Sequence, residues 1–342
     1  MSHTRCGLLT ALSAVITLIC LGCFQENPST PELIPPKPTR QINNPFAGAQ
    51  IYDDPNDEAS LLARQWLKSR PTDALLLAKV GSQPWSKWFV ETNGAIAQEM
   101  GEYFSQAEKA KSVPVSVLYT IPKRDCNSRD AGGGFRSTAA YKQWIIGIGV
   151  AAVFYTGPAV YILEPDAVAS WECLSKADRM ARIDALQFAI SVLATHNHAV
   201  YLDVGNPAWH SSSEILKRIK MFDLSGLRGF ALNVSNFIPT SEVVAYAEAL
   251  YAATGLPSII DTSRNGNGFS TSQGWCNPRG RALGDPPQAV TTNPAVDAYM
   301  WIKAPGESDG SHGDSMTYCH GGPNAGEFWP AYAVELGRNA HW

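Results

Sequence analysis

Short apolar runs alternate with longer amphipathic stretches along most of this chain. The apolar runs are rich in β-prone residues and predict strands at residues 86–90, 115–119, 159–163, 199–203, 229–232, 258–261 and 298–302. The amphipathic stretches predict helices, including residues 57–68, 138–148, 176–196, 211–220, 241–254 and 327–336. Repeated alternation of strand and helix implies an α/β fold with a parallel sheet. Strands that are apolar on both faces suit a closed or nearly closed barrel.

Polar side chains follow six consecutive predicted strands. They are Arg124 and Asp125, Glu164 and Asp166, Asp203, Asn233 and Asn236, Asp261, and Lys303 with Glu307 and Asp309. In a barrel of parallel strands, the carboxyl ends lie on one rim, and that rim carries the active site. One such group is usually a cap or a solvated turn, whereas six together predict a shared pocket.

The strand at 159–163 runs directly into Glu164 and Asp166, with a proline between them. A carboxyl group half inside an apolar wall can hold a proton at neutral pH and deliver it to a leaving group. A second carboxylate such as Asp125 would strengthen this effect by like-charge repulsion, and the pair suits glycoside cleavage. Two plainer interpretations stay open, in which Asp166 caps a helix and Asp125 forms a salt bridge with Arg124.

Three tryptophans, Trp88, Trp209 and Trp275, lie close to strand ends. Indole rings stack on the flat faces of sugars, although core packing is the commoner fate of a single tryptophan. The loop from Lys303 to Asp309 carries one cation and two acids, which could supply a base or a charge clamp. The alternative for this loop is an exposed turn made of turn-forming residues.

The first 42 residues differ from the rest of the chain. An apolar run ends near residue 22 and is typical of an export signal, with Cys23 as a candidate lipid-bearing residue. A proline-rich stretch at 23–42 reads as an extended tether, which leaves residues 43–342 as one catalytic domain. We therefore expect a secreted protein, with two alternatives: a lipid on Cys23 holds it at the outer face of a bacterial membrane, or it is plainly secreted.

Charge and cysteine usage agree with export. The formal net charge is −4 with both signs interspersed, so no nucleic-acid footprint is visible. Four cysteines lie outside the signal region: Cys126, Cys173, Cys276 and Cys319. They allow three pairings, of which we favour Cys126–Cys173 and Cys276–Cys319, because each then ties loops that follow neighbouring strands. Four free thiols are the alternative.

Other kinds of site find little support. His196, His198 and His210 have a permissive spacing for metal, but no acid completes the set and two of them precede a strand. No phosphate-binding glycine loop and no Gly-x-Ser-x-Gly elbow occurs. We therefore expect neither a metal nor a cofactor, and a monomer whose partner is its substrate.

The motifs together resemble the cellulases of glycoside hydrolase family 6. The matching segments stand in family order at residues 117–126, 162–166, 201–205, 229–237, 260–266, 275–278 and 301–310. The resemblance implies a distorted parallel β/α barrel of about seven strands, TIM-barrel-like, and hydrolysis of β-1,4-glucan with inversion. It is also consistent with the two favoured disulfides.

The resemblance further implies roles for individual residues. Asp166 matches the general acid, Asp125 the aspartate that tunes it, Tyr119 the tyrosine that helps to distort the sugar, and Asp309 the proposed base, whose direct role in this family is disputed. Substrate-binding positions are matched by Trp88, Asp203, Trp209, Trp275, Lys303 and Glu307, and the polar strand ends add Asn233 and Asn236.

Two departures from the family and the loop lengths bear on activity. Asn206 stands where the family often has a histidine, and Ser128 is early for the serine that holds the water chain. The loops after Cys126 and before Cys319 are short, which predicts an open cleft and an endo-β-1,4-glucanase. A cellobiohydrolase and a non-hydrolytic glucan-binding protein are the alternatives.

Overall fold

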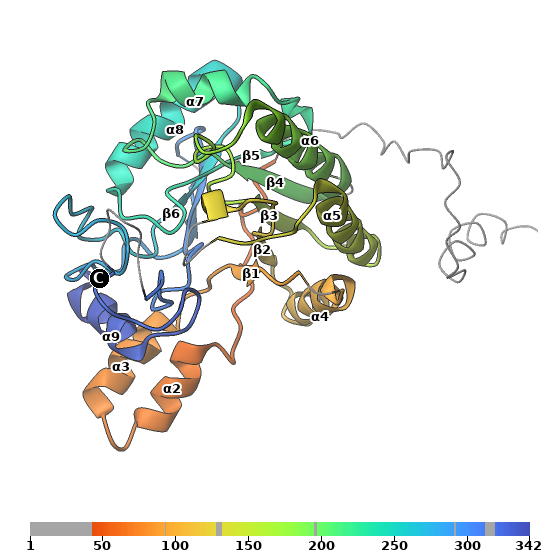
Figure 1. Cartoon of the computed structure of the whole chain (residues 1–342). Coiled ribbons are helices and arrows are strands. Elements are labelled where there is room, and N and C mark those ends of the chain that lie inside the picture. Colours follow the sequence, from red (N-terminus) through yellow and green to blue (C-terminus); the bar gives the residue numbers. More distant parts are fainter. Residues whose placement is uncertain (1–42, 93, 128–131, 195–196, 291, 312–318) are drawn as a thin grey trace, which may run out of the picture. The chain divides into compact units, whose positions relative to one another are not determined.

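The strands of the barrel occur in space in nearly the same order as along the chain (Figure 1). In the described part of the chain, seven of them are parallel: β1 (Lys87–Phe89), β2 (Val115–Leu118), β3 (Ala159–Leu163), β4 (His198–Asp203), β5 (Gly229–Leu232), β6 (Ser258–Asp261) and β8 (Val296–Met300). A short strand, β7 (Gln288–Ala289), pairs antiparallel with β8.

The barrel closes weakly between its first and last parallel strands. A single parallel bridge joins Trp85 to Trp301, where the amide of Ser86 donates to the Trp301 carbonyl at 3.0 Å. The indole of Trp88 adds a bond of 2.8 Å to the Ile302 carbonyl. The predicted distorted parallel barrel of about seven strands is therefore confirmed.

The structure is a computed structural model that describes residues 43–92, 94–127, 132–194, 197–290, 292–311 and 319–342. The predicted signal and tether lie outside these residues. None of the described helices is long and apolar enough to cross a membrane.

Eight helices within the described residues surround the sheet (Figure 1). They are α2 (Glu58–Trp66), α3 (Pro71–Val80), α4 (Ile96–Lys109), α5 (Thr138–Val153), α6 (Lys176–Leu193), α7 (Ser212–Ile219), α8 (Thr240–Thr254) and α9 (Pro330–Asn339). Serine side chains cap three of them at positions 137, 175 and 211, each accepting from an amide in the first turn. Gly255 ends α8 at a φ of 67°, a conformation that glycine adopts without steric cost.

Three apolar clusters hold these layers together. Alternate strand residues, among them Val117, Ile162 and Tyr201, fill the barrel interior, and Phe46 packs against Tyr201. The opposite faces of the strands pack against the helices α4 to α8. A third cluster joins α2, α3 and α9 around the fully buried Trp301.

The predicted elements differ from the observed ones mainly at their ends. The last strand begins at Val296 instead of residue 298, because the polar Asp297 interrupts the apolar run although it lies within the strand. The last helix begins only at Pro330, which stands at its first turn and has no amide proton to lose. The helices α3 and α4 were not among those predicted.

Candidate active site

The carboxyl ends of the parallel strands carry the polar side chains and also the unusual backbone. Of the described non-glycine residues with positive φ, all but Lys111 lie in loops that follow β2, β3, β5 or β6: Lys123, Asp125, Cys126, Glu164, Asp166, Asn233, Ser235 and Asn277. Such conformations cost free energy and persist where surrounding contacts enforce them, which is common at functional sites.

Asp166 lies at the centre of an acid cluster, which we define as Asp125, Asp166 and Asp203. The residue as a whole is partly exposed, and its backbone has a φ of 69°. Burial, the neighbouring charges of Asp125 and Asp203, and a hydrogen bond with Asp125 together raise the pKa of Asp166 well above its usual value. The geometry therefore favours a protonated Asp166 at pH values where an ordinary aspartate is ionised.

Asp125 receives that hydrogen bond and is held from three directions. Its pKa is raised by burial, while hydrogen bonds from Tyr119 and Asp166 and the charge of Arg124 oppose the rise. The Tyr119 hydroxyl donates to Asp125 Oδ2, and the Arg124 guanidinium stacks 4.1 Å from the Tyr119 ring centroid. Asp125 is thus the member of the pair better suited to carry the negative charge.

Asp203 holds the backbone of the turn that carries Asp166. Its Oδ1 accepts from the Asp166 amide at 2.9 Å and from the Gly205 amide at 3.2 Å. Its Oδ2 is buried and has no hydrogen-bond partner among the described residues. Burial raises the pKa of Asp203 to about 7, so this third acid also resists ionisation beside Asp166.

Glu164 joins the two loops that carry Asp125 and Asp166. Its fully buried carboxylate accepts from the Thr120 amide at 3.2 and 3.0 Å and from the Ile121 amide at 3.0 Å. Burial raises the pKa of Glu164 to about 7. Glu164 is therefore committed to positioning the loop after β2, which separates its role from that of Asp166.

Arg182 ties the same two loops together from the helix side, a role that sequence reasoning missed. It lies on the buried face of α6 and donates to the carbonyls of Pro122, Lys123, Ala167 and Ser170 at 2.7 to 3.3 Å. An arginine among the apolar positions of a helix was the signal that could have revealed it.

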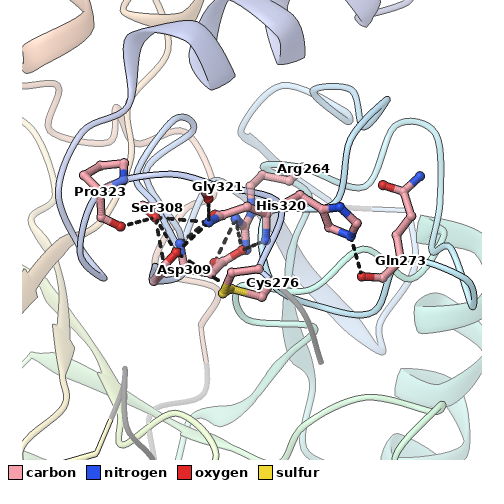
Figure 2. Close-up of a disulfide and its surroundings, with 11 residues drawn as sticks. Arg264, Gln273, Cys276, Ser308, Asp309, His320, Gly321 and Pro323 are labelled. Carbon is pink, nitrogen blue, oxygen red and sulfur yellow. Dashed lines mark hydrogen bonds and ion pairs between the residues drawn. A yellow bond between two sulfur atoms is a disulfide. The ribbon is translucent and has the colours of Figure 1, made fainter. Parts of the chain in front are cut away.

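Asp309 lies in a different electrostatic setting, which Figure 2 shows. The fully buried Arg264 contacts both of its carboxylate oxygens at 2.9 Å, and the Asn277 amide donates to Oδ2 at 3.0 Å. The Asn277 side chain accepts in turn from the Asp309 amide at 2.8 Å. The charge of Asp309 is therefore compensated, unlike the charges in the acid cluster.

Trp88, Lys303 and Glu307 form a connected group beside Tyr119. The rings of Trp88 and Tyr119 meet edge to face with centroids 5.3 Å apart. Lys303 Nζ lies 5.6 Å from the Trp88 ring centroid and 2.9 Å from Glu307 Oε2. An aromatic face flanked by a cation and an acid can bind both the faces and the hydroxyls of a sugar.

The amides after β5 are used within the protein. Asn233 is fully buried, donates to the carbonyls of Ile238 and Asp261, and accepts from the Ile238 amide. Asn236 is 7% exposed and donates to the Val234 carbonyl. Both residues thus shape the loop, and their expected contact with substrate stays a prediction.

Asp261 has a supporting role like that of Glu164. Its buried carboxylate accepts four amide protons, from Ser235, Ser263, Ile302 and Lys303, at 2.9 to 3.2 Å. It therefore joins the loops after β5, β6 and β8 into one rim.

The remaining predicted sugar contacts lie on the rim loops. Trp209 follows β4 and is 39% exposed, and Trp275 follows β6 and is partly exposed. Asn206 is buried, and its Nδ2 has no hydrogen-bond partner in the part of the chain that the structure describes. Ser128 lies outside the described residues, as do parts of both short loops used to predict the cleft.

Both favoured disulfides are confirmed. Cys126–Cys173 joins the loops after β2 and β3, and Cys276–Cys319 anchors the loop beside Asp309 (Figure 2). His198 is buried at the start of β4, where its ring lies 3.3 Å from the Tyr161 hydroxyl, and His196 lies outside the described residues. The described residues contain no group of three or more acids, histidines or cysteines placed to hold a metal ion.

The chain is similar in sequence to known glycoside hydrolases. The profile of Glycosyl hydrolases family 6 matches residues 46–340. Endoglucanase A of Cellulomonas fimi is 37% identical over 85% of the chain, which spans 62% of that protein's length. Endoglucanase 1 of Streptomyces sp. (strain KSM-9) is 40% identical over 79% of the chain and 74% of its own length.

A solved structure with the same fold is that of the endoglucanase Cel6 from Mycobacterium tuberculosis in complex with methyl-cellobiosyl-4-deoxy-4-thio-β-D-cellobioside. It is 39% identical to this chain, superposes with a TM-score of 0.79, and the match covers 87% of this chain and 99% of that one.

Proposed function

The chain belongs to glycoside hydrolase family 6, and we propose that it is an inverting endo-β-1,4-glucanase that hydrolyses internal bonds of cellulose or soluble β-glucan. The observation that carries this proposal is the acid cluster at the strand ends, in which Asp203 accepts from the Asp166 amide at 2.9 Å and Asp125 accepts from the Tyr119 hydroxyl. The 36–40% identity to endoglucanases over most of the chain supports the endo mode.

In the proposed reaction, Asp166 transfers its proton to the glycosidic oxygen while a water molecule attacks the opposite face of the sugar ring. The C–O bond to the leaving chain breaks as the new C–O bond to water forms, so the anomeric configuration inverts. Asp125 stabilises the positive charge that develops on the sugar, and Tyr119 shapes the cleavage subsite. Trp88, Trp209, Trp275, Lys303 and Glu307 bind the neighbouring sugar units.

The route by which the water loses its proton depends on Asp309. Arg264 contacts both carboxylate oxygens of Asp309 at 2.9 Å, so the ion pair competes with a water molecule for these oxygens. We therefore propose that Asp309 orients and polarises the water, and that the proton leaves through further water molecules.

The test of the endo mode is to follow viscosity and reducing ends together during hydrolysis of carboxymethylcellulose. The proposal predicts a steep loss of viscosity at a low yield of reducing ends. Slow viscosity loss with cellobiose as the main early product would indicate a cellobiohydrolase, and binding without product would indicate a non-hydrolytic protein. Detection of the α-anomer first, by proton NMR of cello-oligosaccharide products, tests inversion.

The cellular location is part of the proposal. Two disulfides are typical of proteins from oxidising compartments, which supports export. Lipidation of Cys23 stays a prediction. Labelling of expressing bacteria with radioactive palmitate, compared between the unchanged protein and Cys23→Ala, tests it: label on the unchanged protein alone supports a lipid anchor, and no label on either indicates plain secretion.

A further inference from the structure

A hollow lies beside β1, next to the proposed sugar-binding group of Trp88, Lys303 and Glu307. Its volume is about 250 Å³, close to the lower end of ligand pockets. The segment before α2 and the segment around β1 supply most of its wall, including Tyr52, Asp53, Asp57, Trp85, Ser86 and Lys87. Trp88 and Glu307 line it as well, so the hollow shares two residues with the proposed glucan site.

An unbroken row of contacts leads from the acid cluster to this hollow. Asp125 accepts from the Tyr119 hydroxyl, and the Tyr119 ring meets the Trp88 ring edge to face. Lys303 Nζ lies over the Trp88 ring. Lys303 then pairs with Glu307 at 2.9 Å. Trp88 and Glu307 therefore belong both to the proposed sugar-binding group and to the wall of the hollow.

The wall offers hydrogen-bonding atoms that the described protein does not use. Asp57 is 6% exposed and Ser86 is 1% exposed, and Asp57 Oδ2 and Ser86 Oγ have no partner among the described residues. The other oxygen, Asp57 Oδ1, is already engaged as the cap of α2, with the Ser60 amide at 2.8 Å. Unpartnered buried polar atoms cost free energy that a ligand hydroxyl can recover.

The acids of the wall suit hydroxyl groups better than a cation. They are not gathered into any metal-holding group within the described residues. Burial and the charges of Asp57 and Asp54 raise the pKa of Asp53 to about 6, so this carboxyl keeps its proton to a higher pH than an ordinary aspartate. Tyr52 and Trp85 add aromatic surface, which sugars require.

We propose that this hollow binds one further glucosyl unit, beyond the unit that Trp88, Lys303 and Glu307 bind. The inference rests on the proposed function and deepens it. A further binding position beside β1 would make the enzyme prefer substrates that are long enough to reach it.

The test compares kcat/KM for cellotetraose and cellohexaose in the unchanged protein and in the double variant Asp53→Ala/Ser86→Ala. We expect cellohexaose to be favoured by the unchanged protein, and the variant to reduce that preference at least fivefold with cellotetraose turnover little changed. Glu102→Ala is the matched control and leaves the preference unchanged, since Glu102 is an exposed acid on α4 that accepts a hydrogen bond from Gln98 and does not line the hollow.

Three results overturn the inference: no preference for cellohexaose, a preference that the double variant retains, or a preference that depends on added calcium. The single variant Asp53→Ala alters an exposed residue and serves if the double variant misfolds. If the unchanged protein cleaves no oligosaccharide, the proposed function fails. Calorimetric titration with cellohexaose then decides the inference, and equal affinity of protein and variant contradicts it.

Discussion

Two aspartate sites on one rim are built in opposite ways. The acid cluster of Asp125, Asp166 and Asp203 places three carboxyl groups together, and burial with like-charge repulsion raises the pKa of Asp166. At the paired site, which we define as Arg264 and Asp309, a buried guanidinium compensates the carboxylate with two contacts of 2.9 Å. The same residue type is therefore crowded by other acids at one site and paired with a buried cation at the other.

This difference separates the tasks of an inverting glycosidase. A proton donor must hold its proton at the working pH, and crowding by acids achieves this. A carboxylate that orients a water molecule must be held in place, and the two contacts with Arg264 hold Asp309. The cost differs too, because crowded acids repel one another, whereas the loss of one partner from a buried ion pair leaves an uncompensated buried charge.

The largest expected effect is the loss of the proton donor. Asp166→Ala should lower kcat on soluble β-glucan by about 10³-fold or more, within the range of general acid catalysis. Circular dichroism and thermal unfolding should show an intact fold, since the change relieves repulsion in the acid cluster. Substantial retained turnover would remove Asp166 from the role of donor.

Breaking the paired site should mainly affect stability. Arg264→Met leaves Asp309 buried and uncompensated, which we expect to cost about 3–5 kcal/mol of unfolding free energy. Urea unfolding at pH 7 measures this. The double variant Arg264→Met/Asp309→Asn should recover part of the loss, and a fully additive loss would mean that the pair is not coupled.

The equivalent change in the acid cluster should do the reverse. Asp125→Asn keeps an oxygen that accepts from Tyr119 but removes a negative charge beside Asp166. We expect unchanged or slightly higher stability, while kcat/KM falls about 10- to 100-fold. The alkaline limb of the pH profile should move to lower pH, because Asp166 then releases its proton more readily. A limb that stays in place would show that Asp125 does not tune Asp166.

The smallest expected effect is in the pH dependence of stability. The pKa of Asp203 is raised from 3.8 to about 7, so the folded state binds more protons than the unfolded state between these values. Its contribution to stability is complete below about pH 4 and is lost as the pH rises through 7. Asp203→Asn should reduce the loss of unfolding free energy between pH 5 and pH 8 by roughly 1 kcal/mol or more. An unchanged difference would contradict the raised pKa.

The sequence predicted the strands and the rim better than the contacts across it. Buried parallel strands read as apolar runs. Asp297 interrupts one such run, and its partners lie far away in the sequence: Arg228 just before β5 and Tyr201 in β4. The turn at Glu164 and Asp166 was predicted as well, and the role of Asp166 as the acid stays a prediction.

What the sequence could not predict depends on tertiary neighbours. Nothing local identifies Arg264 as the partner of Asp309, 45 residues away, or shows that Asp261 collects amides from three loops. Asn233 read as a candidate sugar ligand because its place at a strand end is visible, whereas its internal hydrogen bonds are not.

The central claim is that Asp166 donates the proton to the leaving group, and leaving-group dependence tests it most directly. We would compare Asp166→Ala with the unchanged protein on cellotetraose and on a dinitrophenyl cello-oligosaccharide, whose phenolate leaves without protonation. The account predicts a loss of about 10³-fold or more on cellotetraose and little loss on the dinitrophenyl substrate. Equal losses on both substrates would contradict it.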